Sequence, residues 1–205
     1  GLILNSLLAE VIDDPTKNKK EYLKQRIHEL DKKSSEELKE SLKRIEEAVE
    51  GLVKLKTVYG LSVLSVLIPT EMVPTVATKS ILAKCKTAGI WLIGPNSPGM
   101  SRTSVKYPSS HLKVGQIPAQ CILPGEVVVA GVGGTMLFET LVGLKEQNIG
   151  TSWAISLGGD RTRGLSARDT ALIAERDPNV KYIVYIGEPG GFAAQELAEV
   201  MKAGH

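Results

Sequence analysis

The hydrophobic positions of this chain change their period near residue 60. Before that point, Leu23, Ile27 and Leu30 are spaced four and then three residues apart. The same spacing returns in a second run, which comprises Leu38, Leu42, Ile45, Val49 and Leu52. Spacings of three and four place side chains on one face of an α-helix. Residues 1–60 are therefore predicted to be helical, with one apolar stripe in each run.

A turn is predicted between the two runs. Ser34 is followed by Glu37, which is the spacing of a capping box at a helix N-terminus. We therefore expect a helical hairpin over residues 1–60. Two interpretations remain open. The hairpin either packs on the main domain, or it is a docking arm or short coiled coil, although the repeat lasts for only about two heptads.

From Leu61 onwards, apolar runs typical of buried strands alternate with amphipathic segments typical of helices. Strands are predicted at 61–69, 90–93, 125–130, 151–157 and 181–186, and helices at 74–88, 135–147, 166–176 and 192–203. The alternation predicts an α/β fold with parallel-sheet units and right-handed crossovers. The polar, proline-containing residues 100–120 are predicted to be a linker. The last lobe is expected to be incomplete at His205.

Composition excludes several classes of function. The formal net charge of +2 and the aromatic content of 4% argue against a nucleic-acid partner. The two cysteines, Cys85 and Cys121, belong to no metal-binding cluster, so no metal site is expected in the chain. No apolar run reaches the roughly 18 residues of a membrane span. We expect a cytoplasmic protein with no membrane partner.

Glycine-rich turns follow several of the predicted strands. They lie at 94–99, 131–134, 158–160 and 187–191. Turns at the carboxyl ends of parallel strands form the ligand-binding edge of an α/β sheet. Gly131-Val132-Gly133-Gly134-Thr135 opens a helix, but Met136 stands where a dinucleotide fingerprint needs glycine. The loop is either a phosphate cradle on free backbone N–H groups or a tight turn without a ligand.

Glu188 ends an apolar strand on the same predicted edge. Its carboxylate is either an exposed turn residue or a group that orients a histidine or exchanges a proton. Asp160 has the same two interpretations. His28, His111 and His205 lie in no recognisable catalytic setting.

Taken together, these loops resemble those of the succinyl-CoA synthetase α subunit and ATP-citrate lyase, the NDP-forming acyl-CoA synthetase family. The resemblance covers residues 61–205. Thr70–Pro74 is similar to the family's TEG(I/V)P segment, and Ala88–Gly99 to its AG-x-x-(L/M)IGPNCPG. Gly158–Arg161 is similar to its GGD loop, and Gly187–Gly191 to its GEIGG.

The resemblance implies Rossmann- and flavodoxin-like units: a partial CoA-binding unit plus linker at 61–118 and a ligase-CoA domain at 119–205. It implies an acid–CoA ligase that uses CoA and ATP or GTP with Mg²⁺ and acts through an acyl phosphate and a phosphohistidine. A β-type subunit or fused region would bind the nucleotide, so we expect an oligomer, in the cytoplasm or the mitochondrial matrix.

The resemblance also implies roles for particular residues. Gly133, Gly134, Thr135 and Glu139 match the phosphate-binding SGT-x-x-x-E segment. Glu188 matches the glutamate that orients the phosphohistidine. Asn96, Ser97 and Pro98 match the turn near the CoA thiol.

The chain departs from the family pattern at several positions. Gly131-Val132-Gly133 stands where the family has Ser-Arg-Ser, and Ser97 replaces a cysteine. The phosphohistidine is expected beyond this chain, so no histidine here is assigned its role, and the chain alone is expected to be inactive. The alternative is a non-catalytic module of the same fold that binds an anion or nucleotide or assists assembly.

Overall fold

The computed structural model describes residues 14–106, 111–188 and 192–203. The chain divides into two compact units, residues 1–48 and 49–205, and each unit is described by itself. The division falls about a dozen residues before the boundary expected at residue 60. In the described residues, no helix is long and apolar enough to cross a membrane.

The predicted hairpin is replaced by one long helix. After a short 3-10 turn, η1 (Pro15–Lys17), helix α2 runs without a break from Lys20 to Thr57. The turn expected at residues 31–35 is therefore wrong. Residues 31–35 contain no glycine or proline that would end a helix. At 100° per residue, Leu38 and Leu42 fall within about 100° of Leu23, so the two stripes form one face of a single helix.

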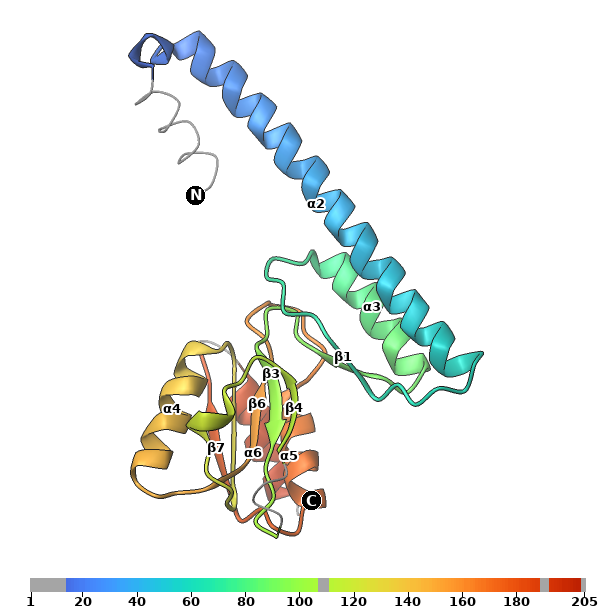
Figure 1. Ribbon diagram of the computed structural model, residues 1–205, viewed down its shortest axis with the longest axis vertical. Helices are drawn as coiled ribbons and strands as arrows, with labels where there is room; N and C mark the ends of the chain where they lie inside the picture. Colours follow the sequence, from blue (N-terminus) through green and yellow to red (C-terminus); the bar gives the residue numbers. More distant parts are fainter. Residues whose placement is uncertain (1–13, 107–110, 189–191, 204–205) are drawn as a thin grey trace. The chain divides into compact units, whose positions relative to one another are not determined.

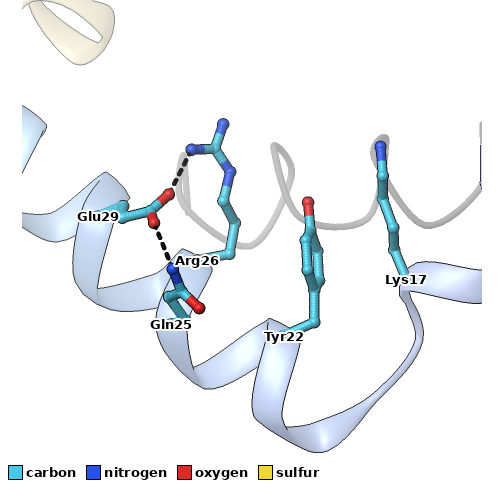
Figure 2. Close-up of a pocket in the computed structure, with 5 residues that line it drawn as sticks. All are labelled: Lys17, Tyr22, Gln25, Arg26 and Glu29. Atoms are coloured by element: carbon cyan, nitrogen blue, oxygen red, sulfur yellow. Dashed lines mark hydrogen bonds and ion pairs between the residues drawn. The ribbon is translucent and has the colours of Figure 1, made fainter.

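Local polar pairs line the first turns of α2 (Figure 2). Gln25 Nε2 donates to Glu29 Oε1 at 3.0 Å, and Arg26 Nη1 pairs with Glu29 Oε2 at 3.0 Å. Pairs three and four residues apart lie on the same helix face, and each stabilises an exposed helix by only a few tenths of a kcal/mol. They support the helix locally and do not define a binding site.

A five-stranded sheet forms the centre of the second unit (Figure 1). Its strands are β3 (Gly99–Arg102), β4 (Leu112–Gly115), β5 (Val127–Gly131), β6 (Thr151–Ser156) and β7 (Tyr182–Ile186). Their order is β4-β3-β6-β5-β7, with β5 parallel to both β6 and β7. The α/β fold class with parallel-sheet units is confirmed, and the three strands predicted for this lobe form its parallel part.

The helices cover both faces of this sheet. Helix α4 (Thr135–Glu146) buries Leu137 and Leu141 against Val127 and Val129 on one face. Val128 and Ala130, the alternate residues of β5, face the opposite cluster, which includes Ala174 of α5 (Ala167–Arg176). Helix α6 (Ala193–Lys202) packs on α5. Burial of both faces explains the unbroken apolar sequence of β5.

The predicted linker at residues 100–120 is wrong, because it contains two strands, β3 and β4, that extend the sheet. Strands β3 and β4 pair antiparallel, and β3 also pairs antiparallel with β6. A 3-10 turn, η2 (Ala119–Cys121), then leads to β5. Strand β4 is exposed along its whole length, and its four residues lack the unbroken apolar pattern of a buried strand. Periodicity alone therefore could not reveal it.

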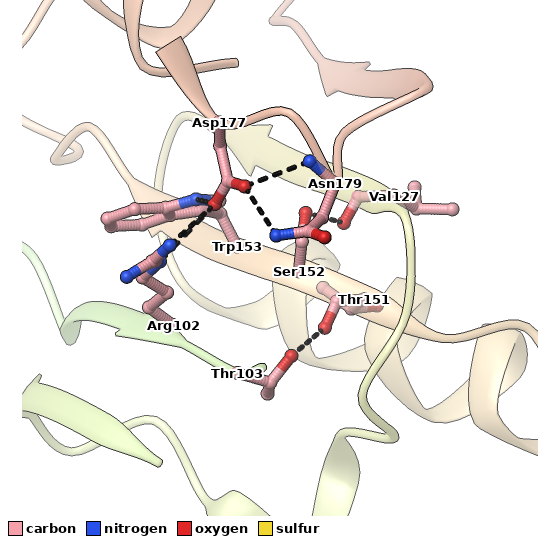
Figure 3. Close-up of polar contacts among 8 residues, drawn as sticks. All are labelled: Arg102, Thr103, Val127, Thr151, Ser152, Trp153, Asp177 and Asn179. Atoms are coloured by element: carbon pink, nitrogen blue, oxygen red, sulfur yellow. Dashed lines mark hydrogen bonds and ion pairs between the residues drawn. The ribbon is translucent and has the colours of Figure 1, made fainter. Parts of the chain in front are cut away.

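A buried carboxylate ties β3 to the rest of the sheet (Figure 3). Asp177 Oδ2 accepts from Trp153 Nε1 at 2.9 Å and from Arg102 Nη2 at 3.1 Å, while Oδ1 accepts from Asn179 N at 3.1 Å. The Arg102 guanidinium also stacks 5.3 Å from the centre of the Trp153 ring. Burial raises the pKa of Asp177, but these hydrogen bonds outweigh it and hold the pKa below its ordinary value.

A smaller sheet carries the other predicted strands. β1 (Ser65–Leu67) pairs parallel with β2 (Trp91–Ile93), and α3 (Thr75–Thr87) connects them. Gly89 follows α3 with φ +63°, as expected for a helix C-terminus. The last turns of α2 join this sheet through Lys56, whose Nζ donates to the carbonyls of Val63 and Gly89.

The continuity of α2 can be tested with proline. Ser35→Pro places a residue without an N–H group in the helix interior, which costs about 3 kcal/mol and breaks the helix. We expect a clear loss of helical ellipticity by circular dichroism. The control Ser35→Ala should keep or increase the signal. Equal helicity in both variants would indicate a turn at this position and contradict the continuous helix.

The Asp177 contacts predict a pH-dependent stability. Asp177→Asn should lower the free energy of unfolding by about 1–3 kcal/mol at neutral pH, because the charge-assisted bond to Arg102 is lost. Since the folded-state pKa is depressed, this stabilisation is present above the unfolded pKa of about 3.9 and is lost as the pH falls through the folded value. Urea unfolding at pH values from 7 downwards should show that the difference in free energy of unfolding between wild type and Asp177→Asn becomes smaller. Glu175→Gln, an exposed neighbour, should leave stability unchanged throughout.

Candidate functional site

The carboxyl ends of the parallel strands bring three of the predicted loops together. Gly131 pairs with Ile186, and the N–H of Val132 donates to the Ile186 carbonyl at 3.2 Å. The N–H of Leu157 donates to the Gly131 carbonyl at 2.9 Å. Val132 and Glu188 line one small cavity of about 50 Å³ together with Arg163. The loops after β5, β6 and β7 therefore meet at one edge, as expected.

The 94–99 turn docks on the loop that follows β6. The Asn96 carbonyl accepts from Gly159 N at 2.8 Å, and the Gly94 carbonyl accepts from Gly164 N at 2.9 Å. A side-chain atom on Gly134 would lie 3.1 Å from Cγ of Pro98. The predicted CoA turn and the predicted phosphate loop are thus in direct contact.

Packing accounts for the glycines of the 131–134 loop. A Cβ on Gly131 would come within 2.8 Å of the Ile186 side chain, and one on Gly134 would crowd Pro98. Gly133 has φ +78°, which L-residues rarely adopt. These glycines satisfy the geometry of the turn. They are consistent with close approach of a ligand but do not require one.

The first turn of α4 offers hydrogen-bond donors. Its N-cap residue, Gly134, provides no side-chain acceptor. At α5, by contrast, the N-cap residue Ser166 and Asp169 form a capping box. Thr135 and, one turn later, Glu139 are exposed on α4. The uncapped N–H groups and the helix dipole make this end of α4 attractive to an anion.

Ser97 has a structural role at this edge. It is 2% exposed, its hydroxyl donates to the Ser156 carbonyl at 2.9 Å, and it accepts from Gly99 N at 3.0 Å. Ser156 in turn donates to the Gly133 carbonyl at 2.9 Å. The two hydroxyls connect the 94–99 turn to the 131–134 loop through β6.

Arg163 lies at this edge, and Tyr185 of β7 packs close to it. Arg163 lines the cavity with Glu188, and its Nη1 donates to the Gly158 carbonyl at 3.3 Å. The Tyr185 hydroxyl is buried and has no hydrogen-bond partner among the described residues. Burial raises the pKa of Tyr185, and the nearby charge of Arg163 partly opposes this effect. A tyrosine within an apolar strand gave no sequence signal of this position.

Asp160 binds a distant part of the chain. Its carboxylate accepts from the backbone N–H groups of Val73 at 3.0 Å and Met72 at 3.3 Å. Met72 has φ +61°. The GGD loop thus fixes the segment that leads into α3, so Asp160 is neither a free turn residue nor a cap of its own loop.

Two histidines, His28 and His111, lie in the described residues. His28 is on the exposed surface of α2, and His111 Nε2 hydrogen-bonds the Ser101 hydroxyl beside β4. His205, like Pro189, Gly190 and Gly191, lies outside the described residues. Within the described ranges, no three His, Cys, Asp or Glu side chains cluster as metal ligands.

Comparison with known proteins identifies the relatives of the chain. No family model matches. The α subunit of ADP-forming succinate–CoA ligase from Staphylococcus aureus is 34% identical over 137 residues, which are 65% of this chain and 42% of that protein. The Aquifex aeolicus α subunit is 32% identical over 111 residues, 54% of this chain and 34% of that one. The chain is a homologue of succinate–CoA ligase α subunits. It spans about two fifths of their length or less.

Solved structures support the fold. ATP citrate lyase from Methanothrix soehngenii, in complex with citrate and coenzyme A, matches with a TM-score of 0.60 and 23% identity, covering 69% of this chain and 23% of that one. A dinucleotide-forming acetyl-CoA synthetase from Ca. Korarchaeum cryptofilum, in complex with phosphate and ADP, matches with a TM-score of 0.60 and 18% identity. The match covers 79% of this chain and 33% of that one. The resemblance to the ligase–lyase group is confirmed, and at this identity these structures establish the fold alone.

The anchoring role of Asp160 predicts a stability effect. Asp160→Ala leaves the N–H groups of Met72 and Val73 without their acceptor, so we expect unfolding to become easier by about 1–3 kcal/mol. Limited proteolysis should also cut the 70–74 segment faster. Arg161→Ala, at the exposed neighbouring position, is the control. Unchanged stability and cleavage in Asp160→Ala would show that the contact does not anchor the segment.

Proposed function

We propose that this chain is the α-type chain of an acid–CoA ligase that forms an acyl-CoA from a carboxylic acid, CoA and a nucleoside triphosphate. The observation that carries the proposal is the 34% identity to succinate–CoA ligase α subunits. It is supported by the four loops with the family's motifs, which converge on one sheet edge. The reaction would pass through an acyl phosphate and a phosphohistidine that this chain does not itself contribute.

The phosphoryl group would bind at the start of α4. Backbone N–H groups at Gly133, Gly134 and Thr135 would donate hydrogen bonds to the phosphoryl oxygens. The positive end of the helix dipole would stabilise the negative charge of the phosphoryl group. The exposed Thr135 hydroxyl is a further donor. Glu139 follows one turn later, where its carboxylate would receive a proton or hydrogen bond from the reacting groups.

Glu188 would orient the phosphohistidine. Its carboxylate is exposed and lines the same cavity as Val132, directly beside the phosphate loop. A carboxylate that accepts from one imidazole nitrogen fixes the tautomer and leaves the other nitrogen free to take the phosphoryl group. This geometry supports Glu188 as a positioning residue for a histidine supplied from outside the described chain.

CoA would place its thiol end beside the 96–98 turn. Asn96, in a left-handed conformation with φ +56°, and Pro98 lie next to the phosphate loop. Ser97 would contribute by holding the turn in place, because both hydrogen bonds of its hydroxyl are made within the protein. Bound there, CoA supplies the thiol that accepts the acyl group.

The remaining components would come from elsewhere. We propose that a β-type subunit or fused region binds ATP or GTP with Mg²⁺ and that the two chains assemble as an oligomer. The compartment would be the cytoplasm or the mitochondrial matrix; a mitochondrial α-2 subunit from Trichomonas vaginalis is 30% identical over 130 residues.

A second candidate is a non-catalytic module that binds an anion or nucleotide or assists assembly. It is favoured by Gly131-Val132-Gly133, which offers backbone groups where the family has two hydroxyls and a guanidinium. The two candidates differ in whether a phosphoryl group is ever transferred.

Phosphorylation distinguishes them. The natural gene product, with a β-type subunit and labelled nucleoside triphosphate, should acquire an acid-labile, base-stable phosphoryl group. Glu188→Gln should slow labelling by at least about tenfold, since the histidine is no longer held in one tautomer. Glu146→Gln, at the far end of α4, should label normally.

Two results would argue against the proposal. Absence of label from the wild-type assembly would favour the non-catalytic module. A normal labelling rate in Glu188→Gln would remove Glu188 from the site while leaving the ligase assignment intact. Circular dichroism of each variant would exclude a general loss of fold.

A further inference from the structure

A larger groove, which does not include residues 94–99 in its lining, is lined by three cations from separate elements. Its volume is about 580 Å³, which falls within the usual range for small-molecule sites. Lys86 comes from the last turn of α3, Arg163 from the loop after β6, and Arg168 from the first turn of α5. The groove is therefore positive on several sides.

The positive charge is not neutralised within the described residues. Lys86, Arg163 and Arg168 form no ion pair there, and Arg163 Nη1 donates to the neutral Gly158 carbonyl. The carboxylate that lines the groove belongs to Asp169. It is engaged in the capping box, where Oδ2 accepts from Ser166 N at 2.8 Å and from Ser166 Oγ at 2.7 Å. An anion in the groove would pair with cations that have no carboxylate of their own.

The groove also presents an aromatic surface. Trp91 of β2 lines it and is 45% exposed, a large exposure for an indole. Leu82, Ile90 and Leu92 add apolar walls. A site that combines an open aromatic face with cations matches a ligand that carries both a flat ring and phosphate groups.

We propose that this groove binds a nucleoside phosphate, with the base on Trp91 and the phosphates between Lys86, Arg163 and Arg168. The site is additional to the proposed ligase edge, where Asn96, Pro98 and Glu188 lie and which shares Arg163 with it. Binding at the groove requires neither a β-type partner nor a phosphohistidine. The proposal therefore stands or falls independently of the ligase assignment.

Calorimetric titration of the whole chain with ADP tests the site. Arg168→Glu and Lys86→Glu should each weaken ADP binding by about tenfold or more, because a charge-assisted contact becomes a repulsion. Trp91→Leu should weaken ADP by about tenfold through lost stacking but leave inorganic phosphate unaffected. Arg176→Glu, at the opposite end of α5, is the matched control and should bind ADP normally.

The proposal is overturned if ADP does not bind, or if Arg176→Glu weakens it as much as Arg168→Glu, which would indicate general electrostatics. Equal affinity for ADP and inorganic phosphate, with no effect of Trp91→Leu, would show a phosphate site without base recognition. A polyglutamate peptide that displaces ADP with higher affinity would assign the groove to an acidic protein segment instead. If the same substitutions weaken CoA binding as they weaken ADP binding, the result would support the site. It would also show that the nucleotide part of CoA can bind there.

Discussion

The candidate site depends on the parallel pairing of β5 with β6 and β7. Parallel strands end on the same side of a sheet, so the loops that follow them are brought together whatever their separation in sequence. The bond from Val132 N to the Ile186 carbonyl fixes the register at that end. A shift of one residue would turn the alternate faces of β5 away from their two cores. The same pairing therefore sets the core and the position of Glu188 beside the phosphate loop.

Several motif residues serve the fold before any ligand arrives. Ser97 and Ser156 connect the 94–99 turn to the 131–134 loop, and Asp160 holds the segment before α3. Such contacts pre-organise a site, because a loop fixed in place loses less conformational entropy on binding. They also explain why motif residues that look catalytic in a sequence can be buried and fully hydrogen-bonded.

Long-range contacts decided what periodicity could not. The antiparallel strands β3 and β4 lie in a polar segment, yet Asp177, Trp153 and Arg102 fix this segment to the sheet. These three residues are 75 positions apart at the extremes. The three cations of the groove, on α3, in the loop after β6 and on α5, likewise meet only after folding, so no spacing in the sequence indicated the groove.

The sequence by itself determined the alternating strands and helices from residue 61 and the turns that carry the family's motifs, because these follow from local periodicity and turn chemistry. It predicted a break at residues 31–35 that α2 does not have, since a capping pattern inside a helix looks the same as one at its start. Only the tertiary structure decided which strands are neighbours, what Asp160 and Ser97 bind, and which charges converge. Those depend on pairing between residues far apart, where many arrangements satisfy the same local pattern.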